Sequence, residues 1–188
     1  ERDTPPEMSE TDRMILEDKS LDYRVLNFFT NTFNENEASY FHKSVGGYHP
    51  AKLRRYQELI EAYISPEMRK AMEAIAKNGG DMAAVDGNAV YPVLNMLNTK
   101  YFIMPLQGGD TAPIENPYAC GNAWFVNKVS FVDNANEELA TVGKIDVRHE
   151  AVADKKFQQT LGASTTNDST ATVTLKSYEP DRLVYDVK

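Results

Sequence analysis

Helix gives way to strand within a single run of the sequence, Pro92-Val93-Leu94-Asn95-Met96-Leu97-Asn98-Thr99-Lys100-Tyr101-Phe102-Ile103-Met104. The residues before Asn98 predict a helix over 89–97 that is interrupted or begins near Pro92, since proline is tolerated in the first turn of a helix. The aromatic and apolar residues that follow predict a strand over 100–104. A helix joined to a strand by so short a turn is typical of an α/β (or α+β) chain.

The same two patterns recur on both sides of this run. The sequence predicts strands at 22–29, 100–104 and 123–132, and helices at 50–64, 66–78, 89–97 and 134–142. It also predicts a short helix that ends near Asp18 and is capped by Thr11 or Asp12. Loops are expected at 31–39 and 105–121. We expect the three strands to form one small sheet that packs against the helices at 50–64, 66–78 and 89–97.

The C-terminal part of the chain has a different composition. Residues 158–170 are small and polar and favour a linker, so the prediction is an α/β domain over 1–157 followed by a β-hairpin over 171–188. Because a lone hairpin is marginally stable in water, it is expected either to pack on the first domain or to begin a truncated β-sandwich. The chain starts without methionine and stops in a strand pattern, so we expect a segment of a longer protein.

Bulk composition excludes several classes of protein. Hydrophobic residues make up 41% of the 188 residues and the net charge is −8, which indicates a globular, acidic domain and disfavours nucleic-acid binding. The single cysteine, Cys120, excludes an internal disulfide and a cysteine-based zinc site. The sequence has no run of about eighteen apolar residues, the length that a membrane span needs.

One segment stands out as electropositive. No acidic residue occurs between Glu37 and Glu58, a stretch that we call the basic segment (38–57), and a Gly-Gly turn there leads into a predicted helix N-terminus. Exposed N–H groups, the helix dipole and nearby cations favour an anion, and tyrosines can stack on a sugar. The candidate ligand-binding residues are Tyr40, His42, Lys43, Gly46, Gly47, Tyr48, His49, Lys52, Arg54 and Arg55. The alternative is a solvated helix face preceded by an ordinary glycine turn.

The sequence offers no catalytic constellation. It lacks a nucleophile elbow, a phosphate-binding loop and a dinucleotide fingerprint. The three histidines, His42, His49 and His149, make a histidine-based metal site an unfavoured reading. We therefore predict no catalytic residue, no metal ligand and no cofactor in this chain.

Several segments together resemble the extracytoplasmic region of the YfhO family of bacterial polytopic membrane proteins, over a span from about Asp22 to the final hairpin. They are Asp22-Tyr23-Arg24-Val25-Leu26-Asn27, Ser39-Tyr40-Phe41-His42-Lys43-Ser44-Val45-Gly46-Gly47-Tyr48-His49-Pro50-Ala51-Lys52-Leu53-Arg54-Arg55-Tyr56-Gln57, Leu94-Asn95-Met96-Leu97-Asn98-Thr99-Lys100-Tyr101-Phe102-Ile103 and Gly121-Asn122-Ala123-Trp124-Phe125-Val126. The second segment is the most distinctive of the four.

The resemblance implies a membrane-embedded, glycosyltransferase-like parent that uses a lipid-linked sugar and, in its membrane part, a divalent metal. The chain is then an extracytoplasmic domain on the periplasmic face of the cytoplasmic membrane, packed against the parent's membrane domain and inactive alone. Its expected ligand is a polyprenyl-phosphate sugar donor, held by Lys43, Lys52, Arg54 and Arg55, or an envelope glycan acceptor. The alternative function is a non-catalytic glycan-binding or scaffolding module of an envelope protein. A free-standing enzyme is the least favoured reading.

Overall fold

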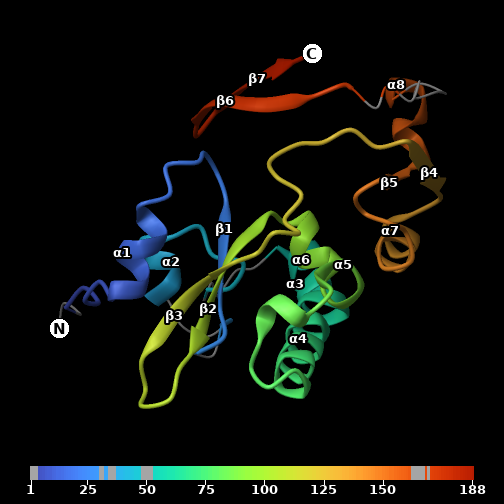
Figure 1. The fold of residues 1–188 in the computed structure, drawn as a ribbon. Helices are drawn as coiled ribbons and strands as arrows, with labels where there is room; N and C mark the ends of the chain where they lie inside the picture. Colours follow the sequence, from blue (N-terminus) through green and yellow to red (C-terminus); the bar gives the residue numbers. More distant parts are fainter. Residues whose placement is uncertain (1–3, 30–31, 34–36, 48–52, 162–167, 169) are drawn as a thin grey trace.

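The computed structural model describes residues 4–29, 32–33, 37–47, 53–161, 168 and 170–188. Its centre is a three-stranded mixed sheet in the order β1-β2-β3. Strand β1 (Arg24–Asn27) runs parallel to β2 (Thr99–Pro105), and β3 (Thr111–Glu115) runs antiparallel to β2. Helices α1 (Glu10–Leu16) and α2 (Glu37–Phe41) lie on one side of this sheet, and the helices between residues 54 and 96 lie on the other (Figure 1).

The alternation of side chains along β1 and β2 explains this layered arrangement. Leu26 and Phe102, both fully buried, belong to the larger hydrophobic cluster, which also takes in Ile64 and Ala71 of the helical layer. Their neighbours point the other way, and Val25 and Ile103 pack with Ile15 of α1. Successive residues of a strand face opposite sides of a sheet, so both faces of this sheet are covered.

A long helical segment forms the far layer and contains a wide turn. Helix α3 (Arg54–Leu59) continues through a π-helical turn, η1 (Ile60–Ile64), into α4 (Ser65–Lys77). The N–H of Ser65 donates to the carbonyl of Ile60, five residues back. Pro66 has no N–H to donate, and its ring crowds the preceding turn of the helix. A π-helical turn is one way in which a helix accommodates such a residue without ending.

Shorter elements connect this helix to β2. They are the 3-10 turn η2 (Met82–Ala84), α5 (Gly87–Val90) and α6 (Pro92–Met96). Two residues, Leu97 and Asn98, separate the end of α6 from Thr99, the first residue of β2.

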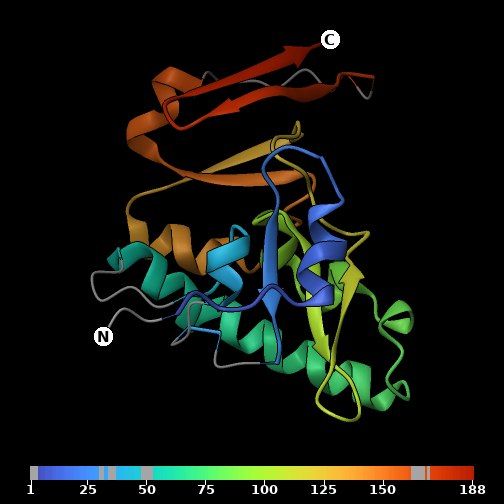
Figure 2. The same cartoon turned by 90° about the vertical axis from the view of Figure 1, so that its left-hand side faces the viewer.

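The remaining chain forms a second lobe and a hairpin. Strand β4 (Lys128–Val132), helix α7 (Ala135–Val142) and β5 (Glu150–Asp154) make a β-α-β unit with parallel strands, followed by η3 (Lys155–Phe157) and α8 (Gln158–Leu161). Strands β6 (Val173–Glu179) and β7 (Arg182–Val187) form a separate two-stranded sheet. Figure 2 shows this hairpin lying across the top of the molecule, above the β4–β5 lobe and the loop before β1.

The predicted fold class is confirmed: small sheets pack with helices, and the chain ends in an antiparallel hairpin. The strand predicted at 123–132 does not join the central sheet, because it pairs with β5 instead. The third central strand, β3, comes from the predicted loop at 105–121, where Pro113 masks the strand pattern.

Helical predictions were also partly wrong. The helices predicted at 50–64 and 66–78 are one continuous helical segment from Arg54. Helix α2 begins within the predicted loop at 31–39 and extends beyond it to Phe41. Ser9, rather than Thr11 or Asp12, caps α1. Of the predicted linker, residues 158–161 form α8, while 162–167 and 169 lie outside the described residues, so the division into two domains stays a prediction.

Candidate functional site

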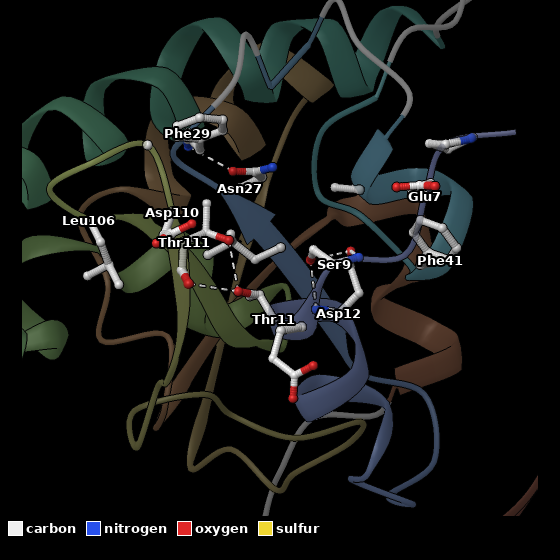
Figure 3. A pocket seen from close by; sticks show the side chains of 15 residues that line it. Glu7, Ser9, Thr11, Asp12, Asn27, Phe29, Phe41, Leu106, Asp110 and Thr111 are labelled. Atoms are coloured by element: carbon white, nitrogen blue, oxygen red, sulfur yellow. Dashed lines mark hydrogen bonds between the residues drawn. The ribbon is translucent and has the colours of Figure 1, made fainter. Parts of the chain in front are cut away.

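A cavity lies between α1, α2, the end of β1 and the β2–β3 turn, and we call it the α1–α2 cavity (Figure 3). Its volume is about 760 Å³, within the range of roughly 300–1,000 Å³ that ligand pockets occupy. Phe29 and Phe41 contribute aromatic rings to its wall, and Leu106 contributes an aliphatic side chain.

Side-chain hydrogen bonds hold the wall that α1 provides. The hydroxyl and the N–H of Ser9 both donate to Asp12 Oδ2, at 2.6 and 3.0 Å, and the N–H of Asp12 donates back to Ser9 Oγ. This is a capping box, which satisfies the free N–H groups at a helix start. The hydroxyl of Thr11 lies 2.8 Å from that of Thr111 and ties α1 to β3.

The electrostatic character of this cavity is acidic. Four carboxylates line it, those of Glu7, Glu10, Asp12 and Asp110, and none of its described lining residues is a lysine or an arginine. Ionised carboxylates only accept hydrogen bonds. The cavity therefore suits a ligand that is rich in hydroxyl or ammonium groups and disfavours a phosphate.

His42, the first basic residue of the basic segment, lies behind this cavity. Its Nε2 is 2.8 Å from Asp12 Oδ1 and its side chain is 2% exposed. Because Asp12 also belongs to the capping box, His42 links α1 to the end of α2. This contact gives His42 a structural role between the two helices, and His42 also lines a smaller cavity of about 260 Å³ together with Lys43.

Lys43 is also engaged within the protein. Its ammonium pairs with Asp22 and lies 3.3 Å from the centre of the Tyr178 ring on the hairpin. Burial would lower the pKa of Lys43, but the hydrogen bonds to Asp22 and Tyr178 and the charge of Asp22 outweigh it and raise that pKa. This contact fastens the end of β6 to the segment that follows α2.

The glycine turn has a packing role. A Cβ on Gly46 would collide with the carbonyl oxygen of Thr32, so only glycine fits there. Gly47 has a φ of +97°, the left-handed region that favours glycine, and its N–H donates to the same Thr32 oxygen at 2.6 Å.

Tyr40, another candidate residue of the basic segment, is 59% exposed on α2.

The remaining basic residues are not gathered with His42 and Lys43. Arg54 and Arg55 are exposed on α3, which lies on the opposite side of the central sheet from α2 (Figure 1). Arg54 Nε contacts Glu58 Oε1 at 2.9 Å along the helix surface. Tyr48, His49 and Lys52 lie outside the described residues, as does the predicted helix start at Pro50.

A network around Asp18 was not foreseen from the sequence. Asp18 Oδ2 lies 2.5 Å from the ammonium of Lys100 and accepts from the hydroxyl of Tyr101 at 2.8 Å. Burial alone would raise the pKa of Asp18, but the hydrogen bonds from Lys100, Ser20 and Tyr101 hold it well below its usual range. Asp18 ends a predicted helix, so nothing in the pattern distinguished it from a surface acid.

Glu67 is a second unforeseen carboxylate. It is 5% exposed in the first turn of α4, and its two oxygens accept from the N–H groups of Val93 and Leu94, each at 2.9 Å. Burial raises the pKa of Glu67 to about 7, against the effect of these hydrogen bonds and of the Lys70 charge, which lower it. An acidic residue beside Pro66 is ordinary in the first turn of a helix. Nothing in the sequence around Glu67 indicates that its side chain is buried.

Comparison with protein-family models, with curated proteins and with solved structures gave no match for this chain. Within the described part of the chain, no three His, Cys, Asp or Glu side chains are grouped so as to hold a metal ion. Among the same residues, no helix has both the length and the apolar character needed to cross a membrane.

Proposed function

We propose that this chain is a non-catalytic, glycan-binding domain that holds sugar units in the α1–α2 cavity. In the parent protein that the YfhO resemblance implies, it would present an envelope glycan acceptor to a membrane-embedded, glycosyltransferase-like part. The chemistry of the cavity wall carries this proposal: carboxylates and aromatic rings line it, and its described lining residues include no lysine or arginine.

The carboxylates supply the polar half of the recognition. Glycan hydroxyls are hydrogen-bond donors, and Glu7, Glu10 and Asp110 offer acceptor oxygens at the cavity wall. Asp12 is less available, because Ser9 and His42 already occupy its oxygens. A phosphate or a sulfated sugar would meet like charge in this cavity.

The aromatic rings supply the apolar half. Phe29 is 48% exposed although it lies at a cavity, and Figure 3 shows it on one side of the hollow with Phe41 on another. An exposed ring at a polar pocket is a favoured contact for the C–H face of a sugar, because aromatic side chains supply large contact areas at low entropic cost.

The proposal is tested by titrating the chain with neutral and amino-sugar oligosaccharides, monitored by calorimetry and amide chemical shifts. Phe29→Ala and Asp110→Asn are expected each to weaken binding about tenfold, as loss of a central contact typically does. The matched control is Phe157→Ala, since Phe157 is also 48% exposed but is not among the residues that line the cavity. Unchanged affinity in both cavity variants, or no binding to any such glycan, would overturn the proposal.

A polyprenyl-phosphate sugar donor is the second candidate ligand, at Arg54 and Arg55. The observation that favours it is their exposure on α3, where the Arg54–Glu58 pair is a solvent-exposed helical pair that contributes only about 0.3–0.5 kcal/mol. Arg54→Ala with Arg55→Ala in the intact parent is expected to lower donor affinity and glycosyl transfer. If donor affinity and glycosyl transfer both stay at the wild-type level, this second candidate fails while the cavity proposal is unaffected.

A further inference from the structure

The outer edge of the C-terminal hairpin is an unpaired strand. Among the described residues, β7 pairs with β6 alone. Figures 1 and 2 show β6 on the side of the molecule's body and β7 at its outer limit. An open edge strand offers a row of N–H and C=O groups to another strand, so β7 is a surface to which one more strand can add.

Strand β7 lacks the features that usually protect such an edge. Proline, lysine or a bulge commonly prevents pairing, but residues 182–187 contain no proline and no lysine. The register shift of the hairpin lies on β6, where Lys176 is an extra residue between Leu175 and Ser177, so β7 runs without interruption. Its large apolar residues, which are between 37% and 61% exposed, are Leu183, Val184, Tyr185 and Val187.

The hydrogen bonds of the hairpin define which residues of β7 face the open edge. Thr172 and Lys188 exchange both backbone hydrogen bonds, at 2.8 and 3.0 Å, so the N–H and C=O groups of Lys188 point toward β6. This direction alternates along an antiparallel strand, so the N–H and C=O groups of Leu183, Tyr185 and Val187 point outward. A partner strand must hydrogen-bond to these three residues.

The charges of β7 make it complementary to a second copy of itself. If two copies pair antiparallel about a two-fold axis, outward-facing residues must meet outward-facing residues, so the axis must pass through a residue of β7. An axis at Val184 places Arg182 opposite Asp186 of the second copy and, by symmetry, Asp186 opposite its Arg182. An axis at Tyr185 sets Arg182 opposite Lys188, and like charges directly opposite each other destabilise a strand pair. An axis one residue closer to the turn leaves both charges opposite uncharged residues.

We propose that β7 is a self-association edge, through which two copies of this chain pair about a two-fold axis at Val184 and form one antiparallel sheet in the order β6-β7-β7-β6. The same register brings Leu183 of each copy opposite Tyr185 of the other, so the apolar face of β7 continues across the interface. A two-fold interface uses the same surface on both copies, as this one does. The described lining residues of the α1–α2 cavity include none from β7, so the inference is independent of the glycan proposal.

Both charges are open to a second copy. Arg182 is exposed on the outer strand. Asp186 Oδ2 lies 3.7 Å from the ammonium of Lys176, but the Asp186 side chain is 40% exposed, and an exposed ion pair of this kind contributes little. Because a carboxylate has two acceptor oxygens, Asp186 can contact Lys176 and Arg182 of the second copy together.

The test exchanges charges between two variants of the 188-residue chain. In sedimentation velocity, the native chain is expected to form a dimer whose fraction rises with protein concentration. Arg182→Glu and Asp186→Arg each place like charges opposite each other at both ends of the interface, so each should weaken association roughly tenfold. An equimolar mixture of the two variants recovers both opposite-charge pairs and should dimerise as the native chain does. The matched control is Arg69→Glu, at an exposed arginine of α4, which should also behave as the native chain.

A cysteine cross-link tests the register without changing any charge. In this register the two Val184 residues form a non-hydrogen-bonded pair, whose Cα atoms are about 4.5 Å apart, a distance that a disulfide spans. Val184→Cys in a Cys120→Ser chain should therefore oxidise to a covalent dimer, whereas Val187→Cys, which lies far from its own copy, should not. The inference is overturned if the native chain stays monomeric, if the mixture associates no better than either variant alone, or if Val184→Cys cross-links no faster than Val187→Cys.

Discussion

Replacing Asn116 tests the joint between the helical layer and the central sheet. Asn116 is 3% exposed, and its Nδ2 donates to Asn95 Oδ1 at 2.9 Å and to the Thr99 carbonyl at 2.8 Å. Its Oδ1 accepts from the N–H of Tyr118 at 3.0 Å. One side chain thus connects α6, the start of β2 and the segment that follows β3.

We expect Asn116→Ala to lower the free energy of unfolding by roughly 3–5 kcal/mol. Three hydrogen bonds are lost at a net value of about 1 kcal/mol each, and buried partners left without a donor add to this. Asn95 is 1% exposed, so its amide oxygen is poorly placed to find water instead. For a chain of this size the loss corresponds to about 10 °C in Tm.

The assay is urea denaturation followed by circular dichroism, with Asn116→Asp as the sharper variant. Aspartate keeps the shape and the Tyr118 contact but sets an oxygen against the oxygens of Asn95 and Thr99, so it should destabilise at least as much as alanine. Asn136→Ala, at an exposed position of α7, is the control and should change stability by less than about 0.5 kcal/mol. A loss below about 1 kcal/mol in Asn116→Asp would refute this account of the joint.

Two other changes test the core and the charge network. Phe102→Ala should lower the free energy of unfolding by about 3–5 kcal/mol, because Phe102 is 0% exposed and its truncation leaves a cavity between sheet and helices. Phe125→Ala, at a residue that is 50% exposed, should lower it far less in the same denaturation experiment. Asp18→Asn should be less stable than the native chain near neutral pH, and the gap should close as the pH falls below about 4. The lowered pKa of Asp18 means that its stabilisation is present above the unfolded value and lost on protonation; a gap that is constant from about pH 6 to pH 2 contradicts this.

The elements that could be predicted from the sequence are those with a strong local pattern. The run from Pro92 to Met104 becomes α6 and β2, and the alternation after residue 171 becomes a hairpin with its turn at 180–181. In both cases the spacing of the apolar residues fits the type of element that forms, and the turn residues stand where that element ends. Strands β3 and β5 had no such agreement: β3 contains Pro113, and β5 (Glu150–Asp154) is bounded by charged residues.

The candidate residues show a related limit. The electropositive character of the basic segment is a property of the charges along the sequence, but charges act through space. Asp12 and Asp22 lie tens of residues upstream of His42 and Lys43, yet they pair with them in the fold. Acids that are absent locally can be supplied by another element, so a local charge count does not determine the field at a site.

The same reasoning explains why the α1–α2 cavity had no signature in the sequence. Its wall combines a capping box on α1, aromatic residues from two separate segments and an aspartate in the β2–β3 turn. Each of these has an ordinary local explanation, since Ser9 and Asp12 satisfy a helix start and Asp110 follows a turn. A binding surface arises only when β2 pairs with β3 and α1 docks on that pair through Thr11 and Thr111, and this docking depends on contacts between residues about a hundred positions apart.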